Sequence, residues 1–260
     1  MPSIPFAKAS ACGNDFLVID FAHAGDNPSE LSRRLCDRHN GVGADGVEWI
    51  LPTSEADIEA RLINADGSEA EVSGNGTRCV AACISDHTGA TKIRILTGAG
   101  VKACELTVHN GTSFEFKAAM GKPEIAGELT VKTRHHETTG IQLSTGNPHF
   151  VIFVEEFEEG WQVLADSVAR TPHFPLGTNI EFVKVLDRHS LDVRLYERGV
   201  GETQSSGTGS CASAVAAIHS GKCESPVRVA TPGGAQTVEW SGEITLTGPA
   251  TIVCTGEFFI

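Results

Sequence analysis

The chain has 260 residues, of which 20 are basic and 33 acidic, so its formal net charge at pH 7 is −13. This balance disfavours nucleic acid and anionic membranes as partners, because binding to phosphate groups needs a basic surface. No apolar run approaches the roughly 20 residues of a membrane helix, and the N-terminal stretch lacks the charged and apolar segments of a secretory signal. We therefore expect a soluble globular protein in the cytoplasm.

Short runs of β-branched and apolar residues predict many strands and place the chain in the α+β class. Strands are expected at residues 16–20, 47–51, 58–64, 92–96, 101–108, 149–155, 180–186, 191–197, 227–231, 236–240, 243–248 and 250–254. Helices are expected at residues 28–39, 77–85, 161–170 and 210–220. The first of these opens with Asn27-Pro28, a cap residue and a proline suited to a first helical turn.

Two short motifs recur with one offset. The pattern Ser-Gly-x-Gly-Ser/Thr occupies residues 73–77 and 206–210, and Gly-Asn occupies residues 13–14 and 146–147. Both pairs are separated by 133 positions, which is close to half the chain. A shared offset between unrelated motifs indicates a duplicated unit.

The duplication predicts two similar α+β halves related by a pseudo-two-fold axis, with the active site in the cleft between them. We place the N-terminal half at residues 1–125 and the C-terminal half at residues 126–260, and the last strands may cross back to the other half. The boundary is expected within residues 118–140, where the sequence is polar and rich in turn residues.

Each glycine loop connects a strand to a helix of small residues. Glycines let the backbone approach a ligand closely, and a helix N-terminus presents N–H groups and a positive dipole end to an anion such as a carboxylate. The alternative is that Ser73 and Ser206 only cap their helices. Neither loop has the lysine of a P-loop or the spacing of a dinucleotide-binding loop, so a nucleoside triphosphate is not expected.

Other polar residues flank the loops. Asn147-Pro148-His149 places an imidazole at the start of a strand, although a turn asparagine and a buried structural histidine would have the same sequence. Glu197-Arg198 at a strand end would suit the ammonium and carboxylate groups of one small zwitterion, or would form an ordinary surface ion pair.

The eight cysteines are scattered and form no Cys-x-x-Cys pair. In a cytosolic chain of this size they are expected to be reduced residues of the core, and we expect no metal site.

Taken together, the segments resemble the diaminopimelate epimerases, a family of cofactor-independent amino-acid epimerases of lysine biosynthesis. The matching stretches are KASACGNDFLVID (8–20), DRHNGVGADGV (37–47), LINADGSEAEVSGNGTRC (62–79), STGNPHFV (144–151), GTNIEFV (177–183) and YERGVGETQSSGTGSCASAV (196–215). The resemblance implies two halves, each a curved mixed sheet wrapped around a central helix, and a homodimer. It implies interconversion of LL- and meso-diaminopimelate by two-base proton transfer at the α-carbon, with no cofactor.

The family's chemistry uses two facing cysteines, and the matching positions here hold Ser73 and Ser206. By the same resemblance, His149 and Glu197 match the acid–base partners beside the thiols, while Gly46 replaces a glutamine of some members. The implied substrate-binding residues are Asn14, Asn64, Gly74, Asn75, Asn147, Asn179, Glu197, Arg198, Gly207 and Thr208. Of these, Asn64, Asn179 and Arg198 match the residues that hold the distal carboxylate.

Three interpretations of the serines follow. The chain is an epimerase whose two catalytic cysteines were replaced by serine, which would leave it inactive or strongly impaired. Alternatively, it is a natural member with altered chemistry, such as a related amino-acid racemase or isomerase, or it is a non-catalytic protein that binds a diamino dicarboxylate.

Overall fold

The computed structural model describes residues 2–134 and 136–260, which fold into two compact units. One unit combines the chain up to Ala118 with the C-terminal segment Gly248–Ile260, and the other is the continuous stretch Ala119–Thr247.

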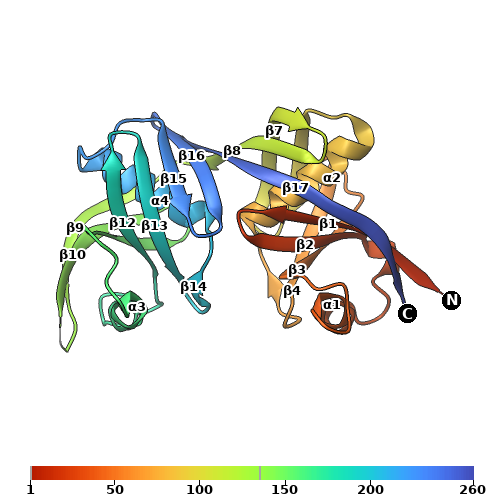
Figure 1. Cartoon of the computed structure of the whole chain (residues 1–260), viewed down its shortest axis with the longest axis horizontal. Coiled ribbons are helices and arrows are strands. Elements are labelled where there is room, and N and C mark those ends of the chain that lie inside the picture. The colour runs from red at the N-terminus through yellow and green to blue at the C-terminus, as the bar shows by residue number, and fades with distance from the viewer. Residues whose placement is uncertain (1, 135) are drawn as a thin grey trace. The chain divides into compact units, whose positions relative to one another are not determined.

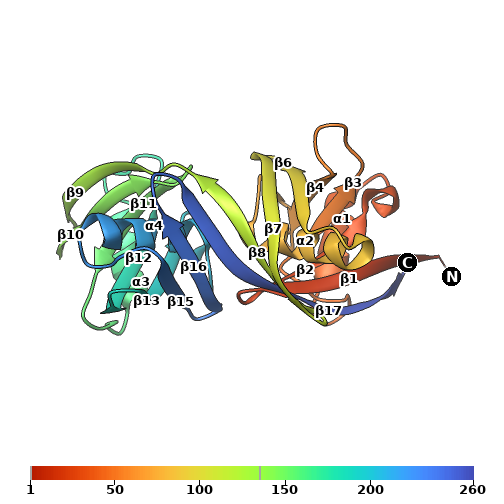
Figure 2. The same cartoon turned by 90° about the horizontal axis from the view of Figure 1, so that it is seen from above.

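The first unit is a curved mixed sheet around one helix. In chain order its elements are β1 (Ser3–Ala11), β2 (Asn14–Asp20), a 3-10 turn (Phe21–His23), α1 (Pro28–Cys36), β3 (Gly46–Leu51), β4 (Ile58–Asn64), β5 (Glu69–Ala70), α2 (Gly74–Thr88), β6 (Lys92–Thr97), β7 (Gly100–Asn110) and β8 (Ser113–Gly121), whose last residues lie beyond the unit. Helix α2 contacts strands β1–β4, β6 and β7 and runs through the middle of the unit (Figure 2).

The second unit repeats this plan. Its elements are β9 (Glu124–Lys132), β10 (Glu137–Ser144), β11 (Pro148–Phe153), α3 (Trp161–Ala169), β12 (Asn179–Asp187), β13 (Ser190–Glu197), β14 (Gly201–Thr203), α4 (Gly207–His219), β15 (Val227–Thr231), β16 (Gly234–Trp240) and the start of β17 (Ile244–Phe259). Helix α4 contacts β10–β13, β15 and β16, and the strands of the unit surround it (Figure 1).

The strand pairings show the duplication directly. Strand β2 pairs in parallel with β3 so that Phe16 faces Gly46, and β11 pairs in parallel with β12 so that His149 faces Asn179. Both partners in the second pair lie 133 positions after their counterparts. The antiparallel pairs β3–β4 and β12–β13 follow in the same order. The predicted α+β class, with two similar halves that each wrap a mixed sheet around a helix, is confirmed.

Small side chains explain why a helix fits inside each sheet. Cys79, Val80, Ala81 and Ala82 of α2 are completely buried, as are residues 211–217 of α4. A helix enclosed by strands on several sides leaves no room for long side chains, and close packing favours alanine and other small residues there. None of the helices in residues 2–134 and 136–260 has the length and apolar character needed to cross a membrane.

Several expected elements differ from the structure. The first helix ends at Cys36 rather than residue 39, because Asp37 turns the chain by accepting the N–H groups of His39 and Asn40. The described residues of the segment 118–140 are mostly extended rather than turns. They form the end of β8, all of β9 and the start of β10, and β9 and β10 pair as antiparallel strands, with alternating exposure along β9.

Candidate functional site

The glycine loop of the first unit leads into α2 through Ser73. Ser73 has an extended backbone with φ of −120°, and its Oγ accepts the N–H of Gly76 at 3.1 Å. The hydroxyl of Thr77 donates to the Ser73 carbonyl at 2.7 Å. The first of these bonds pairs one of the backbone N–H groups that a helix N-terminus otherwise leaves unpaired.

A chain of amide and guanidinium groups fixes this loop against the turn before β2. Asn75 is buried, and its Nδ2 donates to Oδ1 of Asn14 at 2.8 Å. The guanidinium of Arg78, only 2% exposed, donates to Oδ1 of Asn75, to the carbonyl of Gly74 at 3.1 Å and to the carbonyl of Pro249 at 3.2 Å. Arg78 therefore ties the loop to strand β17 inside the first unit.

An ion-pair cluster supports the Asn14 turn from the other side. Arg38 donates to both Asp15 and Asp45 at 2.8 Å, and Lys8 lies 2.8 Å from Asp15. Asn14 in turn donates to Asp45 at 3.1 Å. Burial of Asp15 opposes its ionisation, but hydrogen bonds and charge from Arg38 and Lys8 outweigh that effect and lower its pKa.

A buried carboxyl lies beneath the loop. Glu48, on β3, is 3% exposed, and burial raises its pKa to about 8. Gly76 makes room for it: a Cβ at position 76 would clash with Oε1 of Glu48 and would lie 3.1 Å from its Cδ and 3.2 Å from Cβ of Ser73. Among the described residues, no hydrogen-bond partner reaches the Glu48 carboxyl.

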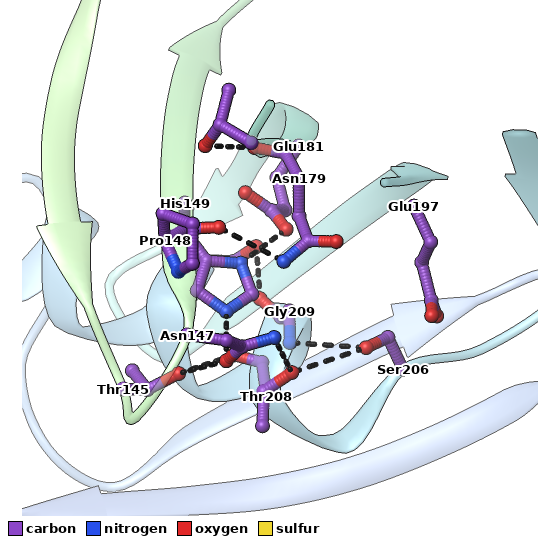
Figure 3. A network of polar contacts seen from close by, with 12 residues as sticks. Thr145, Asn147, Pro148, His149, Asn179, Glu181, Glu197, Ser206, Thr208 and Gly209 are labelled. Carbon is purple, nitrogen blue, oxygen red and sulfur yellow. Dashed lines mark hydrogen bonds and ion pairs between the residues drawn. The ribbon is translucent and has the colours of Figure 1, made fainter. Parts of the chain in front are cut away.

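The loop of the second unit has the same cap. Ser206 has φ of −143°, and its Oγ accepts the N–H of Gly209 at 3.2 Å and lies 3.5 Å from the hydroxyl of Thr208 (Figure 3). Nδ2 of Asn147 donates to Thr208 at 3.4 Å, which repeats the link between Asn14 and Asn75 with a hydroxyl in place of an amide.

A completely buried imidazole joins this loop to the sheet. His149 is 0% exposed, its Nδ1 lies 2.7 Å from Oε1 of Glu181, and its Nε2 lies 2.9 Å from Oδ1 of Asn147 (Figure 3). Because both ring nitrogens face oxygens, Nε2 donates to Asn147, and Nδ1 and Glu181 share a second proton. Burial raises the pKa of Glu181, and the charge and hydrogen bond of His149 oppose this effect.

Further polar residues of the second unit come from the ends of β12 and β13. Asn179 accepts the backbone N–H of Arg198 at 2.9 Å and donates to the carbonyl of Pro148 at 2.9 Å. The guanidinium of Arg198 is exposed and donates to the carbonyl of Leu176 at 3.3 Å. Glu197 accepts from Thr203 at 3.0 Å, and its side chain extends toward the Ser206 end of the loop (Figure 3).

Comparison with known families identifies the scaffold. The family model for diaminopimelate epimerase matches residues 6–126 and 141–253. The chain belongs to the diaminopimelate epimerase family. A diaminopimelate epimerase from Methanococcus maripaludis is 36% identical over 98% of this chain and 99% of its own length, and one from Acetivibrio thermocellus is 37% identical over 97% of both. Membership makes this an isomerase scaffold.

Solved structures of low sequence identity share the fold. A phenazine biosynthesis protein of the PhzF family from Bacillus anthracis has a TM-score of 0.75 at 17% identity and covers 100% of both chains. A probable proline racemase from Agrobacterium radiobacter has a TM-score of 0.72 at 15% identity and covers 97% of this chain and 92% of its own.

Within each unit, the structure gathers most of the residues that the family resemblance singled out. In the first unit Ser73, Gly74, Asn75 and Asn14 lie together, while Asn64 ends β4 beside Gly46 and donates to Ser68 at 3.0 Å. In the second unit the linked residues around the loop are Asn147, His149, Ser206, Gly207 and Thr208, with Asn179, Glu197 and Arg198 at the adjoining strand ends.

Three groups beside the two loops were missed from the sequence: Glu48, Glu181 and Arg78. The 133-residue offset was a usable signal for the first two, because Val47-Glu48-Trp49 aligns with Ile180-Glu181-Phe182 and each places one carboxylate in an apolar strand. Arg78 had no such signal, since position 211 in the second unit is a cysteine.

The cysteines of the chain are free thiols, and most are buried. Burial raises the pKa of Cys36 and of Cys83 to about 12 and that of Cys104 to about 11, and it also raises the pKa of Cys79. A thiol with a raised pKa is a poor source of thiolate, so these four are not activated groups. Within the described ranges, no three His, Cys, Asp or Glu side chains are grouped to hold a metal ion.

Proposed function

We propose that this chain binds diaminopimelate and transfers protons at its α-carbon, with serine hydroxyls at the two positions where the family's chemistry uses thiols. Interconversion of the LL and meso forms takes a proton from one face of the carbon and delivers one to the other. The reaction therefore needs two groups, and the chain offers one loop in each unit.

The observation that carries the proposal is the duplicated loop. Ser73 and Ser206 cap their helices through the same bond to the third residue of the helix. Each loop therefore sets a hydroxyl beside a helix N-terminus, where the dipole favours a carboxylate and stabilises negative charge that develops in a transition state. Retention of this geometry in both units supports a site that still binds substrate.

The exposed guanidinium of Arg198 supports a dicarboxylic substrate. Asn179 fixes the backbone of Arg198, so the side chain starts from a defined point at the end of β13. A guanidinium can hold a carboxylate through two parallel hydrogen bonds. We assign the distal carboxylate to Arg198, Asn64 and Asn179, substrate positioning to Asn14 and Asn147, and proton-transfer support to His149 and Glu197.

Turnover by this chain should be slow. A cysteine thiol ionises with a pKa of about 8.5, whereas a serine hydroxyl is a far weaker acid and needs a neighbouring base. Positioned acid–base groups contribute about 10²- to 10⁴-fold each, and two are affected here. Serine is nearly the size of cysteine, so binding is expected to survive the loss of rate. A homodimer, a cytoplasmic location and independence from pyridoxal phosphate belong to the same proposal.

The test restores both thiols. We expect Ser73→Cys with Ser206→Cys to raise the rate at which the substrate α-proton exchanges with deuterated water by at least about 10²-fold. The matched control, Ser54→Cys with Ser241→Cys, adds thiols at two exposed serines and should leave the rate unchanged.

Calorimetric titration of the parent chain with meso-diaminopimelate measures binding separately. Heat of binding without any exchange in the parent, together with exchange in the double cysteine variant, would assign the parent as a non-catalytic binding protein. Absence of both binding and exchange in every form would reject the proposal.

A further inference from the structure

The carboxyl of Glu48 has no evident structural purpose. Its partners across the flanking strands are Val18 and Leu62, which are apolar, and among the residues described it has no hydrogen bond. Burying a carboxyl without a partner is costly, and sites that accept the cost are often functional.

The carboxyl of Glu48 lies next to Gly76 in the glycine loop of the first unit. Position 76 is a glycine, so no side chain separates Oε1 of Glu48 from Cβ of Ser73 at that point. The Oγ of Ser73 accepts the N–H of Gly76, but no acceptor for its own hydroxyl proton is present among residues 2–134 and 136–260. A buried acid without a hydrogen-bond partner and a serine whose hydroxyl proton has no fixed acceptor thus both lie against the position of Gly76.

The second unit shows what an equivalent carboxyl does when it has a partner. Glu181 occupies the matching position beneath Gly209, 3.1 Å from where a Cβ of that residue would lie, but it is engaged by His149. In the first unit the position that matches His149 is Phe16, which faces Gly46 as His149 faces Asn179. No imidazole is therefore paired with Glu48 beneath the glycine loop of the first unit.

Few charged or titratable groups face Glu48 from the packed elements. On α2, Cys79 lies near it, but burial keeps that thiol protonated because its pKa is raised. Arg78, the cation on the same helix, is committed to Asn75, Gly74 and Pro249. The protonation state of Glu48 is thus controlled by burial rather than by a partner.

We propose that Glu48 is the proton acceptor for Ser73 in the reaction of the first unit. In the abstraction step, the bond between the substrate α-carbon and its hydrogen breaks, and its electron pair stays on the carbon. The proton goes to Oγ of Ser73 as the hydroxyl proton of Ser73 passes to the Glu48 carboxylate. In the reverse direction Ser73 delivers its hydroxyl proton to the carbon and takes one back from Glu48, so the step balances without another reactant. The inference rests on the proposed function and names the base that a serine needs.

This assignment explains why an unpaired acid is tolerated beneath one loop. A carboxyl with a pKa of about 8 is partly ionised near neutral pH and can both accept and return a proton. The rate through Ser73 should therefore rise with pH up to about 8 and level off above it.

The experiment compares Glu48→Gln in two backgrounds. Ser206→Cys retains Ser73, whereas Ser73→Cys with Ser206→Cys replaces it by a thiol that ionises without help. Exchange of the substrate α-proton with deuterated water is measured from about pH 6 to pH 10. Glu55→Gln, at an exposed glutamate of the same unit, is the matched control, and thermal melting checks that every variant folds.

In the background that retains Ser73, we expect Glu48→Gln to lower the rate by about 10²-fold and to remove its rise toward pH 8. In the background that carries Ser73→Cys, the loss should be at least about tenfold smaller, because the thiol needs no base. If Glu48→Gln does not fold, Glu48→Asp, which draws the carboxyl back by one methylene, should show the same dependence on the background.

Three results would overturn the inference: equal losses in both backgrounds, no loss where Ser73 is present, or no exchange in Ser206→Cys although the double cysteine variant exchanges. Failure of the double cysteine variant to exchange, together with absence of binding heat, would reject the proposed function itself.

Discussion

The two glycine loops have nearly the same backbone and different chemistry beneath it. Both begin with a serine cap and both lie above a glutamate in an apolar strand. In the second unit the glutamate is paired with His149, and the loop is linked through Asn147. In the first unit Phe16 replaces the imidazole, and the loop is instead held by the buried guanidinium of Arg78.

The difference shows how a duplicated fold can divide its roles. Strand register fixes the position of a carboxyl under each loop, while a single neighbouring residue decides whether that carboxyl is part of a buried pair or is left alone. The paired form keeps a proton between two groups, and the unpaired form has its pKa set by burial. Altering one partner at a time tests this division of roles.

The largest effect is expected from Glu48→Gln on stability at alkaline pH. The pKa of Glu48 is about 8 in the folded chain against an ordinary value of 4.5, so the folded state retains a proton that the unfolded chain loses as pH rises between these values. The free energy of unfolding of the parent chain therefore falls across that window. At pH 9 we expect Glu48→Gln to be more stable than the parent by about 3 to 5 kcal/mol. Near pH 4.5 the parent chain and Glu48→Gln should be equally stable.

Urea unfolding at both pH values measures this difference, with Trp49 fluorescence reporting on the first unit in a chain that carries Trp161→Phe and Trp240→Phe. Glu55→Gln should show no such dependence. Equal stability of parent and Glu48→Gln at pH 9 would contradict the raised pKa.

The second prediction converts the second unit toward the first. His149→Phe removes the partner of Glu181, whose Oε2 already has no hydrogen bond within the described part of the chain. We expect a loss of about 3 kcal/mol in the free energy of unfolding, because a buried acid is left uncompensated. Urea unfolding measures it.

The double variant His149→Phe with Glu181→Leu should recover most of this loss, since it replaces the whole pair by apolar groups. If the double variant is no more stable than His149→Phe alone, the cost lies in packing of the ring rather than in the orphaned carboxyl.

The smallest effect distinguishes the glycines above the two carboxyls. Gly76→Ala places a methyl group against Glu48, and Gly209→Ala places one 2.6 Å from Cδ2 of Leu195 and 3.1 Å from Oε1 of Glu181. Each should cost about 1 to 3 kcal/mol through overpacking.

Thermal melting of double variants separates the two cases. Shortening Glu48 to alanine should restore the melting temperature that Gly76→Ala lowers. Shortening Glu181 should not restore that of Gly209→Ala, because Leu195 still blocks the methyl group. Restoration of both would show that the two loops are equivalent in packing as well as in backbone.

Much of the fold was predictable from local patterns. The 133-residue offset, the apolar strands around Val47 and Ile180, and the small-residue helices each have a direct physical cause in side-chain size and alternation. The loop residues Ser73 and Ser206 were found because glycine spacing and cap preference are local features.

The remaining features depend on contacts between distant segments. Strands β9 and β10 carry polar side chains and are stabilised by pairing with each other, which no single window reveals. Glu48 lies in a strand whose first four residues are all buried, so the alternation that normally separates inward from outward residues is absent there. Its role is defined by the fit against Gly76 of another element.

Strand β17 imposes an order on how the chain can be made. Ser3 pairs with Phe259, so strand β1 is completed by residues that are synthesised after the whole of the second unit. Residues 119–247 form a continuous unit and can fold as soon as they emerge from the ribosome, whereas the earlier residues must wait for their final strand. Residues 2–118 are therefore expected to reach their native structure after residues 119–247, although they are translated earlier.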